Sequence, residues 1–187
     1  DRSVLLDILF YAGLRRGEAL ALRVKDVTER GLLRVRQNRV RTMKHGVVIQ
    51  SPKTKSSCRD VTVPRFLSEE IFAFIKKMPE QPGEEDLIFP DVTPESYSKW
   101  FHNEQIRRNI MPHIRLHDLR HSHATLLLEL GFNVQAIADR LGHENADQVI
   151  RTYGHFYPEV RDEIAEALEK ICYVVTFVKP QFKKYKI

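Results

Sequence analysis

Four short strings of the sequence carry side chains that could act on a phosphate group. They are residues 13–18 (GLRRGE), 52–59 (PKTKSSCR), 117–121 (HDLRH) and 141–155, which begins LGH and ends YGH. Cleavage of a phosphodiester builds negative charge on its non-bridging oxygens, and fixed cationic donors that meet this charge lower the barrier. Arginine suits the task because it stays charged and grips two oxygens with its planar fork. The strings together indicate a site that binds and cleaves a phosphodiester.

In their order along the chain, the strings resemble the catalytic domain of the tyrosine recombinase (phage integrase) family. The resemblance covers about residues 4–160. It implies that Arg15 and Arg120 hold the scissile phosphate. His117, at i, i+3 from Arg120 on one helix, would accept a proton from the nucleophile. His143 matches the family's second histidine and would stabilise the developing charge.

A tyrosine is the nucleophile that this resemblance implies. A phenol with a pKa of about 10 is mostly protonated at neutral pH and must be activated. Tyr153 matches the family's tyrosine, and Tyr157 is the alternative. Attack on DNA would leave a 3′-phosphotyrosyl link and a free 5′ hydroxyl. Because this ester retains the energy of the original linkage, we expect no cofactor.

The leaving 5′ oxygen needs a proton, which a lysine on a β-hairpin turn supplies in this family. Lys53 and Lys55 both lie in the turn before the strand expected from residue 59. The Pro-Lys-Thr string favours Lys53, and Lys55 stays open. Nearby arginines would lower the pKa of such a lysine by like-charge repulsion.

Each of these residues taken alone more often has a structural role, and only their joint order indicates catalysis. His117 and His121, at i, i+4, also suggest a zinc site, but the string lacks the glutamate of a zinc hydrolase. The adjacent Arg120 would repel a dication, so we expect no metal. Glu18 and Asp118 are expected to orient the arginines or the histidine, or to serve as helix N-terminal charges.

Basic side chains concentrate in residues 31–59, which contain eight Lys or Arg and no Asp or Glu. Over the whole chain, 30 Lys and Arg stand against 25 Asp and Glu. A basic surface attracts a polyanion, so we expect double-stranded DNA as the partner, with a merely solvated hairpin as the alternative. The residues expected to contact DNA are Arg34, Arg36, Arg39, Arg41, Lys44, Lys55 and Arg59.

Apolar spacing predicts the elements that must position these side chains. Helices are expected at residues 4–10, 19–22, 67–77, 94–109, 116–130, 134–141, 146–153 and 158–171. Strands rich in β-branched residues are expected at 32–35, 47–49 and 61–63. The fold class is therefore α+β: a mainly helical single catalytic domain, residues 1–172, with a small three-stranded antiparallel sheet.

The remaining residues, 173–187, form a C-terminal tail of different character. Residues 173–178 (YVVTFV) combine high β propensity with no charge and no proline. Such a segment needs a partner, so we expect an added strand on the edge of the basic sheet. It could pair in its own subunit or in a neighbour's, and the resemblance favours the neighbour in a DNA-bound assembly.

Composition excludes several classes of protein. With 187 residues, 42% of them apolar, and two distant cysteines, the chain needs no disulfide or metal to fold. Its apolar runs are too short for a membrane span, and it opens on a helical pattern. We expect a cytoplasmic bacterial protein, acting at the nucleoid, and a fragment that lacks the upstream DNA-binding domains of its family.

The resemblance is to integrases of phages and of integrative or conjugative transposons, and it implies site-specific recombination by a homotetramer on DNA. An accessory excision factor is a further candidate partner. Two alternatives stay open. One is a type IB topoisomerase, which relaxes supercoils with the same chemistry. The other is a non-catalytic module that reads DNA with residues 116–142 as a helix-turn-helix.

Overall fold

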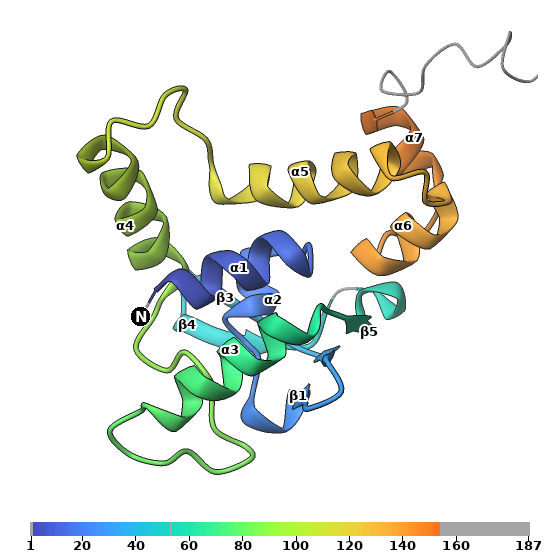
Figure 1. The fold of residues 1–187 in the computed structure, drawn as a ribbon. Coiled ribbons are helices and arrows are strands. Elements are labelled where there is room, and N and C mark those ends of the chain that lie inside the picture. Colours follow the sequence, from blue (N-terminus) through green and yellow to red (C-terminus); the bar gives the residue numbers. More distant parts are fainter. Residues whose placement is uncertain (1, 53, 154–187) are drawn as a thin grey trace, which may run out of the picture. The chain divides into compact units, whose positions relative to one another are not determined.

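The helices predicted from apolar spacing up to residue 153 are present in the computed structural model, which describes residues 2–52 and 54–153 (Figure 1). Their bounds are α1 (Ser3–Tyr11), α2 (Arg16–Ala19), α3 (Arg65–Lys76), α4 (Pro94–Arg107), α5 (Leu116–Glu129), α6 (Val134–Leu141) and α7 (Asp147–Tyr153). Helix α2 lies three residues earlier than the helix expected at 19–22. Two short 3-10 helices are η1 (Val24–Asp26) and η2 (Lys55–Ser57). The mainly helical character expected from the sequence is confirmed.

Helix α1 lies at the centre of the larger hydrophobic core and packs against both α3 and α5 (Figure 1). Leu5 and Ile8 of α1 are completely buried, as are Leu33 of the sheet and Ile71 of α3. Burial of one such side chain stabilises the fold by roughly 1.5–3 kcal/mol. This core packs against the α1–α2 turn and fixes its position.

Within residues 2–153, apart from residue 53, the structure has two antiparallel sheets where the sequence predicted one. The strands are β1 (Val27–Thr28), β2 (Leu32–Val35), β3 (Asn38–Thr42), β4 (Gly46–Gln50) and β5 (Arg59–Thr62). A three-stranded sheet is confirmed, but its order is β1-β2-β5, and residues 47–49 lie instead in a separate hairpin of β3 and β4. Strand β2 pairs directly with β5, Val35 opposite Arg59, so the hairpin is an excursion from that sheet.

A smaller core joins the last three helices described. Its buried side chains are Ala124, Ile137, Ala138, Leu141 and Val149. Gly142 caps the C-terminus of α6, and its φ of 68° is a left-handed conformation that glycine adopts without strain. The chain thereby reverses direction and presents the next residue, His143, toward α5.

Several predictions fall outside the described residues. These are Lys53, Tyr157, the helix at 158–171 and the tail at 173–187, with its choice of partner. Within the described part of the chain, none of the helices has the length and apolar character needed to cross a membrane.

Candidate active site

Arg15 lies at the turn between α1 and α2, where it is the N-terminal cap residue of α2. Its backbone N–H donates to Glu18 Oε2 at 2.9 Å, and its Nη1 donates to Glu18 Oε1 at 2.8 Å. The Glu18 side chain is buried, whereas 37% of the Arg15 side chain is exposed. Glu18 therefore fixes the guanidinium and leaves part of it open to solvent, which agrees with the orienting role predicted for Glu18.

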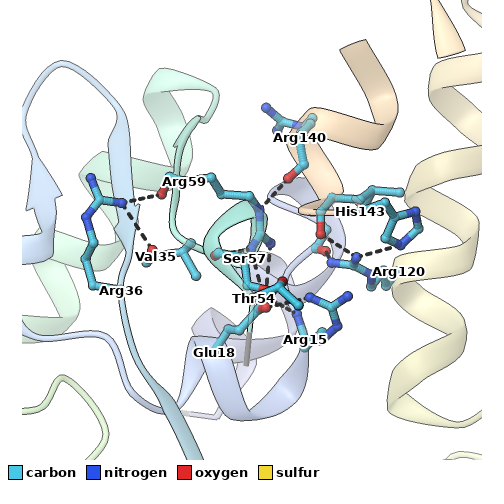
Figure 2. Close-up of polar contacts among 12 residues, drawn as sticks. Arg15, Glu18, Val35, Arg36, Thr54, Ser57, Arg59, Arg120, Arg140 and His143 are labelled. Carbon is cyan, nitrogen blue, oxygen red and sulfur yellow. Dashed lines mark hydrogen bonds and ion pairs between the residues drawn. The ribbon is translucent and has the colours of Figure 1, made fainter. Parts of the chain in front are cut away.

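Arg120, one turn into α5, is buried and points between two other segments (Figure 2). Its Nη1 donates to the carbonyl of Gly13 at 2.7 Å, and its Nη2 donates to the carbonyl of Leu141 at 2.5 Å. The first contact ties α5 to the turn that carries Arg15. The second ties α5 to the end of α6, next to His143.

His143 faces Arg120, with its Nε2 3.1 Å from Arg120 Nη2. Burial, and then the charges of Arg120, Arg15 and Arg59, lower the pKa of His143 to about 4. Because a guanidinium can only donate, Nε2 is the acceptor and the proton of the neutral ring is on Nδ1. That buried Nδ1 has no hydrogen-bond partner among the described residues. The ring thus carries a donor that is unused in this structure.

His117 is exposed in the first turn of α5, with its ring 4.7 Å from that of His121 in an edge-to-face arrangement. Although the side chain is exposed, partial desolvation by its neighbours lowers the pKa of His117, and the charges of His121 and Arg120 lower it further. A neutral imidazole at neutral pH can accept a proton. Asp118 caps the same helix, since the backbone N–H of Arg115 donates to it at 2.7 Å. Of its two predicted roles, Asp118 therefore has that of helix N-terminal charge.

The remaining catalytic candidates are placed only in part. Tyr153 is the last residue of α7, which packs on α6. Lys55 is exposed in η2, and Lys53 lies outside the described residues.

Two clefts meet at Arg15. One, of about 760 Å³, is lined by residues that include Arg15, Thr54, Ser57, His143, Arg151 and Thr152. The other, of about 730 Å³, is lined by residues that include Arg15, Arg16, Arg41, His102, Arg115 and His117. Arg15 thus borders both clefts and can be reached from either of them. His143 lines the first cleft and His117 the second.

Comparison with known proteins decides the family. Residues 1–159 match the Phage integrase family. The chain belongs to the phage integrase family. It is 32% identical over 185 residues to the ICEBs1 integrase of Bacillus subtilis (strain 168), which covers 88% of this chain and 47% of that relative. It is also 32% identical over 173 residues to the integrase of Mycobacterium phage L5, covering 88% of the chain and 46% of the relative.

Solved structures support the integrase fold. The Tn1549 transposon integrase in complex with circular intermediate DNA has a TM-score of 0.75 at 21% identity, covering 91% of this chain and 59% of that one. The catalytic domain of bacteriophage HP1 integrase has a TM-score of 0.57 at 22% identity, covering 89% and 81%. The family and fold class predicted from the sequence are therefore confirmed. The chain spans about half the length of the curated integrases it matches.

Several basic residues of the integrase chain hold its own backbone. Arg39 donates to the carbonyls of Phe89 and Pro90 at 2.8 and 2.9 Å, so it anchors β3 to the loop before α4. Arg34 donates to a carbonyl of η1, and Arg36 to the carbonyl of Arg59. The others, Arg41, Lys44 and Lys55, are exposed, and Arg41 lies 3.5 Å from Glu95.

Arg59 stands apart from the other predicted DNA contacts because it is buried, with a side chain only 7% exposed. The structure thus places it beneath the integrase site instead of on its surface. The alternation of β5 held the signal, since Arg59 and Val61 share the buried face of the strand.

Two further integrase residues, His123 and Arg140, were not among the predicted site residues. Arg140 Nε donates to His123 Nε2 at 2.9 Å, and its two Nη atoms donate to the carbonyls of Thr62 and Tyr11. Burial, and then the charges of Arg140 and Arg120, lower the pKa of His123 to about 4. This pair fixes α6 against α1 and β5. A histidine three residues after Arg120 was the available signal.

The charges at the centre of the integrase site do not balance. Glu18 is the buried carboxylate there, whereas Arg59 and Arg120 are buried arginines and Arg15 is half-buried. Such an excess of fixed positive charge favours a bound anion. Over the described part of the chain, no group of three or more His, Cys, Asp or Glu could hold a metal ion.

Proposed function

We propose that this chain is the catalytic part of a site-specific DNA recombinase that works through a 3′-phosphotyrosyl intermediate. The observation that carries the proposal is the meeting of Arg15, Arg120 and His143. These residues come from three separate segments, yet hydrogen bonds join Arg120 both to the turn of Arg15 and to His143. An arrangement of two arginines and one neutral histidine suits a single phosphate with two non-bridging oxygens.

In the proposed reaction, the Tyr153 oxygen attacks the phosphorus and its proton passes to His117. The bond from phosphorus to the 5′ oxygen breaks, and that oxygen takes a proton from Lys53, with Lys55 as the alternative. Arg15, Arg120 and His143 stabilise the charge that develops meanwhile. In the second step, a 5′ hydroxyl from another strand gives its proton to the lysine and attacks the phosphorus of the phosphotyrosyl ester. The bond from phosphorus to the Tyr153 oxygen breaks, that oxygen takes the proton back from His117, and a phosphodiester is restored. The steps balance without an external cofactor.

Double-stranded DNA is the proposed substrate. Two basic residues of the β3–β4 hairpin are exposed: Arg41, which lines the cleft of Arg15 and His117, and Lys44 in the turn. Both suit contacts to phosphates that flank the scissile one. The Tn1549 integrase, a structure of similar fold, is in complex with DNA. We further propose a homotetramer on DNA, served by an accessory excision factor, for the whole protein.

The integrase family match favours recombination over the two alternatives. A type IB topoisomerase would relax supercoiled plasmid without forming recombinants. A helix-turn-helix module would bind DNA without cleaving it. Against this alternative, Arg120 of α5 makes contacts inside the domain instead of facing outward as a DNA-reading residue would.

The decisive experiment is covalent trapping on a nicked suicide substrate by the complete protein. The wild-type protein should form an adduct that resists denaturation, and Tyr153→Phe should lose it while still binding DNA, because only the hydroxyl is removed. Tyr157→Phe is the matched control and should keep the adduct. An adduct that survives in Tyr153→Phe and vanishes in Tyr157→Phe would reverse the assignment, and a wild type without adduct would overturn the function.

A further inference from the structure

Arg59 lies beneath the site and hydrogen-bonds to Glu18, Ser57 and Arg140 (Figure 2). Its Nη2 donates to Glu18 Oε2 at 2.9 Å, and its Nη1 lies 3.3 Å from Glu18 Oε1. Nη1 also donates to the carbonyl of Ser57 at 3.1 Å, and Nε donates to the carbonyl of Arg140 at 2.6 Å. One guanidinium therefore joins three segments that are far apart in the sequence.

Each of those segments carries a residue of the proposed mechanism. Glu18 binds Arg15 from the other side, so the two arginines share one carboxylate. Ser57 is the last residue of η2, which begins at Lys55, one of the two candidate lysines. Arg140 is two residues before Gly142, whose missing Cβ would lie 2.9 Å from Arg59 Nη1. The end of α6 thus rests directly on the Arg59 guanidinium.

We propose that Arg59 is a positioning residue that holds the Arg15 guanidinium, the η2 turn that begins at Lys55, and His143 in one geometry. The inference rests on the proposed function and assigns Arg59 no contact with DNA. Through Glu18 it fixes Arg15, through Ser57 it fixes the turn, and through the carbonyl of Arg140 it fixes the residue pair that follows α6.

Only arginine has the donors for this task. Its fork meets both carboxylate oxygens while Nε serves a third partner, whereas lysine is a point charge with a flexible stem. Burial raises the pKa of Glu18, but the hydrogen bond and charge of Arg59, with those of Arg15, more than offset this and lower it. Without Arg59, Glu18 would be a buried carboxylate held from one side only. Its grip on Arg15 would weaken accordingly.

The test compares Arg59→Lys with Arg65→Lys in the complete protein. Arg65 is a surface arginine of α3, 88% exposed and paired with Glu69. A displacement of about 1 Å at the reacting groups costs on the order of 10²-fold in rate. Single-turnover cleavage by Arg59→Lys should therefore fall by on the order of 10²-fold with DNA affinity within about threefold of wild type. Arg65→Lys should match the wild type in both.

Two further readouts separate positioning from other roles. If Arg59 contacted DNA, Arg59→Met would reduce the salt dependence of binding by about one phosphate contact, whereas we expect that slope to be unchanged. If Arg59 acts through Glu18, the losses of cleavage in Arg59→Lys and Glu18→Gln should be far from additive in the double variant. An altered salt slope or additive losses would overturn the inference.

Folding is checked by circular dichroism of each variant. Should Arg59→Lys be unfolded, Glu18→Gln tests the same contact with a near-isosteric change. Its cleavage should fall by more than tenfold with binding retained, and undiminished cleavage would overturn the inference. Failure of the two proposals is distinguishable. A wild type without covalent adduct refutes the function, whereas a cleaving wild type with an equally active Arg59→Lys refutes only the positioning role.

Discussion

Gly142→Ala should destabilise the chain well beyond the same substitution at Gly131. Both glycines follow a helix and have a left-handed φ, 68° for Gly142 and 80° for Gly131. That conformation costs an L-residue roughly 1–2 kcal/mol at either position. A Cβ at Gly131 would meet nothing within 4 Å, but at Gly142 it would lie 2.9 Å from Arg59 Nη1 and 3.0 Å from the carbonyl oxygen of Ser56.

The extra cost at Gly142 follows from what Arg59 would have to give up. Its guanidinium cannot shift away from a new Cβ without stretching its bonds to Glu18 and to the carbonyl of Ser57. Crowding of a packed interior costs typically about 1–3 kcal/mol. Together with the backbone penalty, Gly142→Ala should lower the free energy of unfolding by roughly 2–5 kcal/mol, against about 1–2 kcal/mol for Gly131→Ala.

Urea unfolding of the two variants and the wild type measures these free energies, provided that the m-values agree. In the complete protein, Gly142→Ala should also slow cleavage more than it weakens DNA binding, while Gly131→Ala should do neither. Equal unfolding free energies for the two variants would refute the reasoning, because they would mean that the buried Arg59 yields without cost.

Three other predictions concern the catalytic side chains and their support. Arg15→Ala should reduce cleavage by on the order of 10²-fold with a smaller loss of unfolding free energy than Arg120→Ala, because Glu18 keeps its hydrogen bonds to Arg59. Arg120→Ala should reduce both cleavage and unfolding free energy, because the carbonyls of Gly13 and Leu141 lose their donor. Cleavage and urea assays on both variants decide this. Cleavage by Lys53→Ala should recover on a substrate with a bridging 5′ sulfur, because this leaving group needs no proton. If Lys55→Ala recovers instead, Lys55 is the general acid. Because the folded pKa of His123 is lowered to about 4, its neutral form stabilises the fold above the unfolded pKa of about 6.5, and this is lost as the pH falls toward 4. His123→Gln should flatten that decline in urea-unfolding curves, and an unchanged decline would contradict it.

Helix positions were readable from the sequence because their signals are local. Periodic apolar residues with a glycine directly after them predicted α5 and α6, and the glycines at 131 and 142 do have positive φ. Strand pairing was less readable. Strand β1 has only two residues, too few for an alternation signal, so residues 47–49 took its place in the predicted sheet.

The order of the four sequence strings predicted the chemistry of the site. It did not predict which residues hold those side chains in place. Arg15, Arg120 and His143 could be named from the sequence alone, because the family resemblance identifies each by its neighbours. The partners beneath them lie on other segments, such as the carbonyls of Gly13 and Leu141 for Arg120. A basic run in the sequence does not show which of its arginines donate to backbone carbonyls and which face solvent. Arg39, for example, donates to two carbonyls.

The direct pairing of β2 with β5 bears on how this chain can diverge. Val35 and Arg59 are paired across the two strands, and Arg36 adds a hydrogen bond at the same point by donating to the Arg59 carbonyl at 2.8 Å. The segment of residues 37–58 therefore leaves the β2–β5 sheet and returns to it at the same point. The entropic cost of closing such a loop rises only slowly with its length. Pairs of residues can be added to or removed from the β3–β4 hairpin while the β2–β5 register stays intact. The length of this hairpin can thus change without any change in the contacts that hold Arg15 and Arg120.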